Sequence, residues 1–142
     1  MSAENVELVR RTWDASRAAD WPGVLATLDP NAEIYDFDVP DGGLTRGHDG
    51  FFTWLGRWAE AWGSWHEEEL EIRPVGDDRV IALFRMVATG SHSGLELDRR
   101  DAIVYRIEDG LIVYTAYFSD QAQALEAVDA LGSRGSRQQA ND

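Results

Sequence analysis

Residues 101–120, with the sequence DAIVYRIEDGLIVYTAYFSD, decide the fold class of this chain. Two apolar stretches rich in β-branched and aromatic side chains flank Glu108-Asp109-Gly110, a pattern that is typical of a β-hairpin. Apolar residues occupy both faces of the two expected strands. We therefore expect one face of the sheet to cover helices and the other face to contact a second subunit.

The alternating pattern continues on the N-terminal side of this hairpin. It predicts four consecutive strands, at about 65–75, 79–91, 95–108 and 111–119, and an earlier short strand at 32–38. Amphipathic spacing and capping residues predict helices at about 3–19, 20–28, 48–62 and 120–131. This order of elements indicates an α+β fold. We expect a curved, mostly antiparallel sheet wrapped around three helices, as in a cystatin-like α+β barrel, with a conical cavity inside.

The length of 142 residues fits one domain, which we expect to span residues 1–131. Residues 132–142, GSRGSRQQAND, are small and polar and are predicted to form a disordered tail. The N-terminus has no apolar signal-peptide core, and no apolar run reaches the length of a membrane span. These features predict a cytoplasmic protein without membrane contacts.

The composition excludes several classes of chemistry. With 26 acidic and 13 basic residues, the net charge of −13 argues against nucleic acids and anionic lipids as partners. The chain has no cysteine, which excludes thiolate catalysis and cysteine-ligated metals. It also has no lysine, so no Schiff base can form. His48, His66 and His92 show no metal-ligand spacing, and we expect neither a metal nor another cofactor.

Carboxylates are the main candidates for acid–base chemistry. In the first strand of the hairpin, Arg99 and Asp101 lie on one face, so that the guanidinium can fix or activate the carboxylate. Asp36 and Asp38 share a face of the earlier short strand. If both faces turn into the cavity, burial and neighbouring charge raise carboxyl pKa values, and one carboxyl can act as a base while another donates a hydrogen bond. The alternatives are an ion pair on a wet sheet face and a solvated turn.

Aromatic side chains are the expected walls of the cavity. Trp54 and Trp58 recur at helical spacing, for which core packing is the first interpretation and a cavity wall is the alternative. Tyr114 and Tyr117 lie on opposite faces of the last strand, and either could supply a hydroxyl donor or be a satisfied core tyrosine. His92 follows a long strand and is a candidate general acid at the mouth of the cone. The candidate pocket residues are Trp13, Trp54, Trp58, Phe84, Tyr114, Tyr117 and His92.

Several short motifs occur in a characteristic order along nearly the whole chain. They are ELVRR at 7–11, LDPNAE at 28–33, RGHDG at 46–50, DGLI at 109–112 and YFSD at 117–120. In this order they resemble the SnoaL-like branch of the nuclear-transport-factor-two-like superfamily. The resemblance implies the cone-shaped α+β fold, a small apolar ligand and a homodimer. The superfamily includes ketosteroid isomerases, polyketide cyclases, limonene-type epoxide hydrolases, scytalone dehydratases and non-enzymatic binding domains.

The resemblance also bears on the candidate carboxylates. Arg99-x-Asp101 is similar to the arginine–aspartate pair of the epoxide-hydrolase branch. Asp36 and Asp38, however, stand where that branch has a tyrosine and an asparagine, and Thr115-Ala116 stands where it has a second aspartate. By similarity to ketosteroid isomerases, Asp36 or Asp38 would be the base, and Asp101 or a tyrosine would be the hydrogen-bond donor.

Two functions are compatible with the sequence. The first is a cofactor-independent enzyme that transfers protons in an apolar carbonyl or epoxide compound, by isomerisation, cyclisation, dehydration or epoxide opening. The second is a non-catalytic ligand-binding or dimerisation module with the same fold, since a shared fold does not fix function. The two hypotheses differ in whether Asp36, Asp38 and Asp101 converge inside the cavity.

Overall fold

The computed structural model describes residues 2–39 and 43–128 of the chain. The predicted tail at 132–142 lies outside the described residues, as do residues 129–131 of the last predicted helix. A final helical segment occupies residues 121–128. The elements that precede it are α1 (Ser2–Arg17), α2 (Trp21–Leu25), β1 (Leu28–Asp36), β2 (Gly43–Arg46), α3 (Gly47–Ala61), β3 (Trp62–Val75), β4 (Arg79–Gly90), β5 (Glu96–Glu108) and β6 (Leu111–Phe118).

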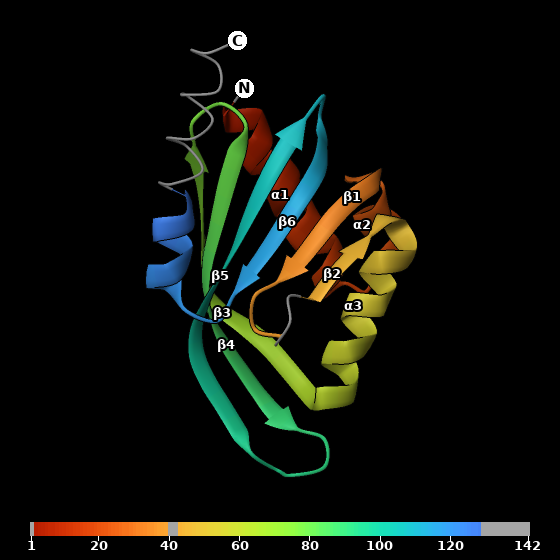
Figure 1. Cartoon of the computed structure of the whole chain (residues 1–142), viewed down its shortest axis with the longest axis vertical. Coiled ribbons are helices and arrows are strands. Elements are labelled where there is room, and N and C mark those ends of the chain that lie inside the picture. Colours follow the sequence, from red (N-terminus) through yellow and green to blue (C-terminus); the bar gives the residue numbers. More distant parts are fainter. Residues whose placement is uncertain (1, 40–42, 129–142) are drawn as a thin grey trace.

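Six strands form one curved sheet in the order β2-β1-β6-β5-β4-β3. Every neighbouring pair is antiparallel except β1 and β6, which are parallel. The helices α1, α2 and α3 lie on the concave side, whereas segment 121–128 lies on the opposite side (Figure 1). The predicted α+β class and the mostly antiparallel, curved sheet are confirmed. The sheet stays open, because β2 and β3 are edge strands that do not pair with each other.

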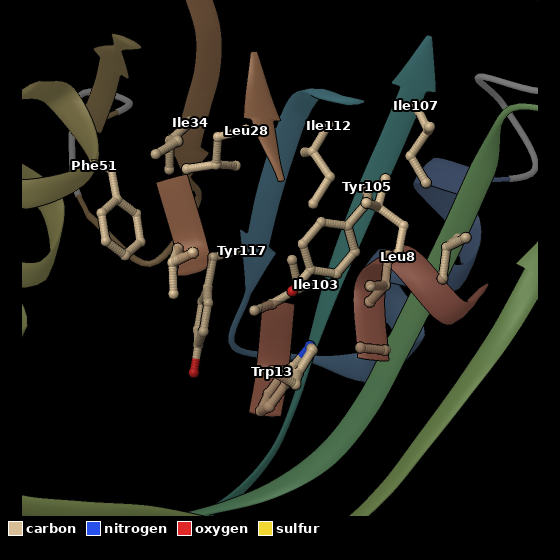
Figure 2. Close-up of a cluster of buried hydrophobic side chains, with 14 of the residues drawn as sticks. Leu8, Trp13, Leu28, Ile34, Phe51, Ile103, Tyr105, Ile107, Ile112 and Tyr117 are labelled. Atoms are coloured by element: carbon tan, nitrogen blue, oxygen red, sulfur yellow. The ribbon is translucent and has the colours of Figure 1, made fainter. Parts of the chain in front are cut away.

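The larger part of the core lies between the concave face and α1 to α3. Alternation along β4 sends Val80, Ala82, Phe84 and Met86 to this side, where they meet α1 residues such as Trp13. Figure 2 shows the same arrangement for β5 and β6, with Ile103, Tyr105, Ile107 and Ile112 facing Leu8 and Trp13 of α1. Because the sheet curves around the helices, the apolar stripes of both layers are buried together.

The outer face carries a second, smaller core. Ile81, Leu83 and Val104 pack there against Ala124 and Val128 of segment 121–128. Gln121 anchors this segment, since its side-chain amide donates hydrogen bonds to the backbone oxygens of Phe84 and Asp101. The chain's own helix therefore covers part of the face that we expect to contact a second subunit, and that contact stays a prediction.

The region between α2 and α3 differs most from the sequence prediction. The strand β1 begins at Leu28, inside the stretch predicted as helix, and ends at Asp36 instead of residue 38. Pro30 is accommodated because the β1–β6 register is irregular between Leu28 and Glu33. The strand β2 was not predicted, since its four residues, GLTR, show no apolar alternation.

Local signals explain how the helices are placed. Asp20 caps α2, and its carboxylate accepts a hydrogen bond of 3.1 Å from the backbone N–H of Gly23. Gly47 links β2 to α3 with a φ of +74°, and a Cβ there would lie 3.0 Å from the backbone oxygen of Pro30. No helix in the described residues is long and apolar enough to cross a membrane.

Candidate functional site

A cavity of about 470 Å³ lies between the concave face of the sheet and α1 to α3. Most of its wall is apolar. The predicted pocket residues Trp13, Trp54, Trp58, Phe84 and Tyr117 line it. The other lining residues are Thr12, Ser16, Arg17, Trp21, Val24, Leu28, Ile34, Phe51, Leu55, Trp65, His66, Glu67, Met86, Ile103, Tyr105 and Thr115.

The aromatic rings of the wall contact one another. The ring centroid of Tyr117 lies 5.1 Å from that of Trp58 and 6.0 Å from those of Trp54 and Phe84. Trp13 meets Phe84 edge to face at 4.9 Å. Trp54 and Trp58 are four residues apart on α3, which places both indoles on one helix face. The wall is thus built from α1, α3, β4 and β6 together.

Asp36 lies behind this wall and is only 2% exposed. One carboxylate oxygen accepts hydrogen bonds from the indole N–H groups of Trp54 at 2.8 Å and Trp58 at 3.3 Å. The other oxygen accepts a bond of 2.9 Å from the backbone N–H of Asp38. Burial raises the pKa of the Asp36 carboxyl above its ordinary value, and the hydrogen bonds oppose this shift only in part.

Asp101 is completely buried, and Arg99 binds it through two nitrogens, at 2.6 Å from Nε and 3.0 Å from Nη2. The Tyr117 hydroxyl donates a short hydrogen bond to the same carboxylate. Arg99 also reaches Asp38 at 3.3 Å. Burial and the negative charge of Asp101 raise the pKa of the Tyr117 hydroxyl. Tyr117 therefore stays protonated and acts as a hydrogen-bond donor.

The structure brings the four predicted catalytic residues, Asp36, Asp38, Arg99 and Asp101, into one polar cluster. None of the four lines the cavity. The cluster is connected to the cavity through Trp54, Trp58 and Tyr117, whose polar atoms bind its carboxylates. Protein donors already bind both oxygens of Asp36 and of Asp101. This arrangement fixes the aromatic wall and leaves neither carboxylate in contact with the cavity.

Two predicted pocket residues lie elsewhere, and both assignments are corrected. Tyr114 packs against the outer core around Ile81 and Val104, because its side chain alternates with those of Thr115 and Tyr117, which face the cavity. His92 is exposed in the turn between β4 and β5 and does not line the cavity.

Sequence reasoning treated Trp13 only as a wall residue and missed a polar pair inside the cavity. Trp13 is 6% exposed, and its indole N–H has no hydrogen-bond partner of acceptable geometry. The indole nitrogen points towards the Tyr105 hydroxyl (Figure 2) and partly offsets the rise in the Tyr105 pKa that burial causes. Tyr105 shares a face of its strand with Asp101 and Ile103, and this spacing was a signal for its position.

Sequence reasoning also missed Glu67, whose carboxyl belongs to the cavity lining. It pairs with Met86 of β4 in register, and this places it on the concave face. Burial raises the pKa of the Glu67 carboxyl, whereas the positive charge of Arg17 lowers it to a lesser extent. Glu67 belongs to the run Glu67-Glu68-Glu69, which by composition alone is typical of a solvated strand. The described residues contain no group of three acidic or histidine side chains that could hold a metal ion.

Fold and site together define an open α+β cone that encloses an aromatic, mainly apolar cavity. The family model of the SnoaL-like domain matches residues 9–115 of the chain. The chain therefore belongs to the SnoaL-like domain family, which confirms the resemblance noted in the sequence. No match was found among curated proteins.

Solved structures of the same fold agree with this assignment. An NTF2-like protein from Burkholderia xenovorans LB400 has a TM-score of 0.74 at 18% identity, over 90% of this chain and 98% of that one. An NTF2-like protein from Burkholderia thailandensis E264 has a TM-score of 0.72 at 25% identity, over 86% and 95%. TerC, co-crystallised with polyporic acid, has a TM-score of 0.71 at 20% identity, over 89% and 98%.

Proposed function

We propose that this protein binds a small, largely apolar molecule through a carbonyl or similar acceptor oxygen. One observation carries the proposal: the unpartnered indole N–H of Trp13 lies beside the Tyr105 hydroxyl within an aromatic cavity of about 470 Å³. A cavity of this size and lining suits a small organic ligand.

The energetics favour an acceptor atom on the ligand. A buried N–H without a partner costs about 1–3 kcal/mol, and a ligand oxygen placed between Trp13 and Tyr105 removes this cost. An indole N–H can only donate a hydrogen bond, and a tyrosine hydroxyl can donate one as well. TerC, which shares the fold, was co-crystallised with polyporic acid. This neighbour supports a small organic molecule as the ligand of the present cavity.

The test uses β-tetralone and tetralin, which have the same carbon skeleton with and without a carbonyl group. We expect β-tetralone to bind about tenfold more tightly by isothermal titration calorimetry, which corresponds to one well-made hydrogen bond. Trp13→Phe and Tyr105→Phe should abolish this difference while tetralin still binds. Tyr114→Phe, on the outer face, is the matched control. Equal affinities for the two compounds in the wild type would contradict the proposal.

For the polar cluster, we propose a positioning role. Asp36, Asp38, Arg99 and Asp101 hold the side chains of Trp54, Trp58 and Tyr117 in the wall, and they act on a ligand only through those residues. This arrangement favours ligand binding over direct proton transfer by Asp36 or Asp101. Isomerisation, cyclisation, dehydration or epoxide opening would then need a proton-transferring group in the cavity itself.

A further inference from the structure

We propose that Glu67 is the catalytic acid–base residue of this cavity and removes a proton from the carbon next to the carbonyl group of a bound ketone. The inference rests on the binding function proposed above. It adds a reaction and a residue that the polar cluster of Asp36 and Asp101 does not supply.

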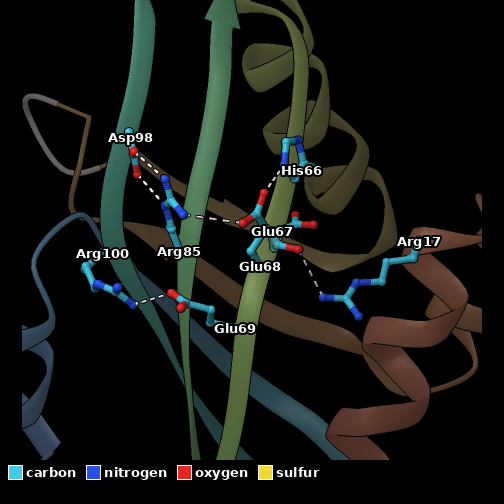
Figure 3. A network of polar contacts seen from close by, with 8 residues as sticks. All are labelled: Arg17, His66, Glu67, Glu68, Glu69, Arg85, Asp98 and Arg100. Atoms are coloured by element: carbon cyan, nitrogen blue, oxygen red, sulfur yellow. Dashed lines mark hydrogen bonds and ion pairs between the residues drawn. The ribbon is translucent and has the colours of Figure 1, made fainter.

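The position of Glu67 carries the argument. It is the only carboxylate among the described residues that line the cavity. Figure 3 shows Glu67 on the side of β3 that faces Arg17 of α1. Its neighbours Glu68 and Glu69 form ion pairs with Arg85 at 3.5 Å and Arg100 at 2.7 Å.

The Glu67 carboxylate, by contrast, forms no ion pair with any arginine in the described part of the chain. Arg17 approaches Glu67 through a backbone contact, since its Nη2 donates to the Glu67 backbone oxygen at 3.5 Å. The guanidinium of Arg17 also lies 5.6 Å from the ring centroid of Trp13. The carboxylate therefore keeps lone pairs available for a ligand.

The charges around Glu67 suit a group that both takes up and returns a proton. Burial raises the pKa of its carboxyl, and the charges of Arg17 on α1 and of the adjacent His66 on β3 limit the rise. A carboxyl that titrates closer to neutral pH is a more effective acid–base catalyst. The negative charge of Glu67 contributes to the raised pKa of Tyr105 on β5. Glu67, Trp13 and Tyr105 all line the same cavity.

The proposed step is balanced without any further reactant. The ketone oxygen accepts hydrogen bonds from the Trp13 N–H and the Tyr105 hydroxyl. The Glu67 carboxylate takes a proton from the adjacent carbon, and the electron pair of that C–H bond forms the carbon–carbon double bond of an enolate. The negative charge moves to the ligand oxygen, where both donors stabilise it. Glu67 then returns a proton to the same carbon or to a conjugated one, which exchanges or isomerises the ligand.

The test is deuterium exchange of β-tetralone in D₂O. The loss of the ¹H NMR signal of the protons on the carbon between the ring and the carbonyl group measures its rate. We expect the wild type to accelerate exchange and Glu67→Gln to lose at least about tenfold of that rate, a conservative value for general base catalysis. The dissociation constant of β-tetralone should stay within about twofold, because Trp13 and Tyr105 are intact. After subtraction of the spontaneous exchange, the wild-type rate should rise with pH as Glu67 loses its proton, and Glu67→Gln should lack this rise.

Glu69→Gln is the matched control, since Glu69 is two residues away, is exposed and forms its ion pair with Arg100. Its exchange rate should equal that of the wild type. An unchanged rate in Glu67→Gln would overturn the inference, as would a loss of exchange confined to Asp101→Asn. Binding of β-tetralone without accelerated exchange would overturn the role of Glu67 alone. A failure of β-tetralone to bind would overturn the proposed function and the inference together.

Discussion

Single residues decide how the wall of the cavity is held. Asp101 is fully buried, its charge is balanced by the guanidinium of Arg99, and the Tyr117 hydroxyl donates a further hydrogen bond to it. A buried charge that loses its partner is strongly destabilising, whereas a fully satisfied one is tolerated. The Arg99–Asp101 pair therefore has a structural role, whatever reaction the cavity supports.

Arg99→Met should lower the free energy of unfolding by about 3–5 kcal/mol at neutral pH, because it leaves the carboxylate of Asp101 buried without its cation. Urea unfolding measures this loss. The control is Arg85→Met, which breaks the exposed pair with Asp98 and should cost at most about 1 kcal/mol. Similar small losses in both variants would contradict the buried pair.

Asp36 should make stability depend on pH. Burial raises the pKa of its carboxyl in the folded state, so the folded protein binds a proton that the unfolded chain has already released. The contribution of Asp36 is thus fully present below the unfolded pKa of about 4, and it is lost as the pH rises through the folded pKa. The free energy of unfolding of wild type relative to Asp36→Asn should fall over this window by up to about 1.4 kcal/mol per pH unit.

Asp98 is the control with the opposite sign, because the hydrogen bond from Arg85 lowers the pKa of its carboxyl. Its contribution is present above the unfolded pKa and is lost as the pH falls through the folded value. Chemical unfolding of wild type, Asp36→Asn and Asp98→Asn across acidic pH compares the two. If the free energy of unfolding of wild type minus that of Asp36→Asn rose with pH, this would contradict the raised pKa of Asp36.

At the scale of elements, the two faces of β4 to β6 serve different layers. The concave face packs on α1 and lines the cavity, while the outer face packs on segment 121–128. That short helical segment covers part of the outer face, for which two-sided apolarity suggests a second subunit. Its inner side is well defined: Ala124 is 0% exposed and the neighbouring Leu125 is 41% exposed.

Ala124→Asp should therefore lower the free energy of unfolding by at least about 2 kcal/mol, because it buries an unpaired carboxylate against Ile81 and Val104. Leu125→Asp should change it by no more than about 0.5 kcal/mol, since this side chain faces solvent. Thermal or urea unfolding measures both. Equal effects of the two substitutions would show that the segment does not pack on the sheet as described.

At the scale of the whole molecule, the open edge of the sheet leaves an apolar patch on the outer face. Tyr35 of β1 pairs in register with Leu44 of β2, and Phe37 follows, stacked at 4.6 Å on Phe118. Phe37 and Leu44 are both exposed. Tyr35, Phe37 and Leu44 do not belong to the outer core that packs against segment 121–128.

We propose that the homodimer predicted from the sequence forms through this patch of Tyr35, Phe37 and Leu44. Sedimentation equilibrium should then give twice the 15.9 kDa mass of one chain. Phe37→Asp should produce a folded monomer, and Phe52→Asp, at an exposed position on α3, should remain dimeric. A monomeric wild type, or a Phe37→Asp dimer, would contradict the proposed interface. The predicted cytoplasmic location stays a prediction.

The sequence by itself determined the class of fold, the strands β3 to β6 and the pairing of Arg99 with Asp101. Alternation and helical spacing report which side chains share a face, and turn residues report where a strand ends. The same signals placed β1 with the wrong bounds and missed β2, because a proline, a register irregularity and a four-residue strand interrupt the periodic pattern.

Only the tertiary structure decided which side chains reach the cavity. A pattern of period two defines two strand faces without showing which one turns inward. From the sequence, Tyr114 and Tyr117 were therefore equally good candidates for the cavity, and only the packing of β6 distinguishes them. Asp36 lies behind the indoles of Trp54 and Trp58, and Asp101 lies behind Tyr117. These contacts join residues that are 16 to 22 positions apart in the chain. Glu67 belongs to a run of three glutamates, so the sequence does not distinguish it from its neighbours. It lines the cavity because it lies opposite Met86 on the concave face.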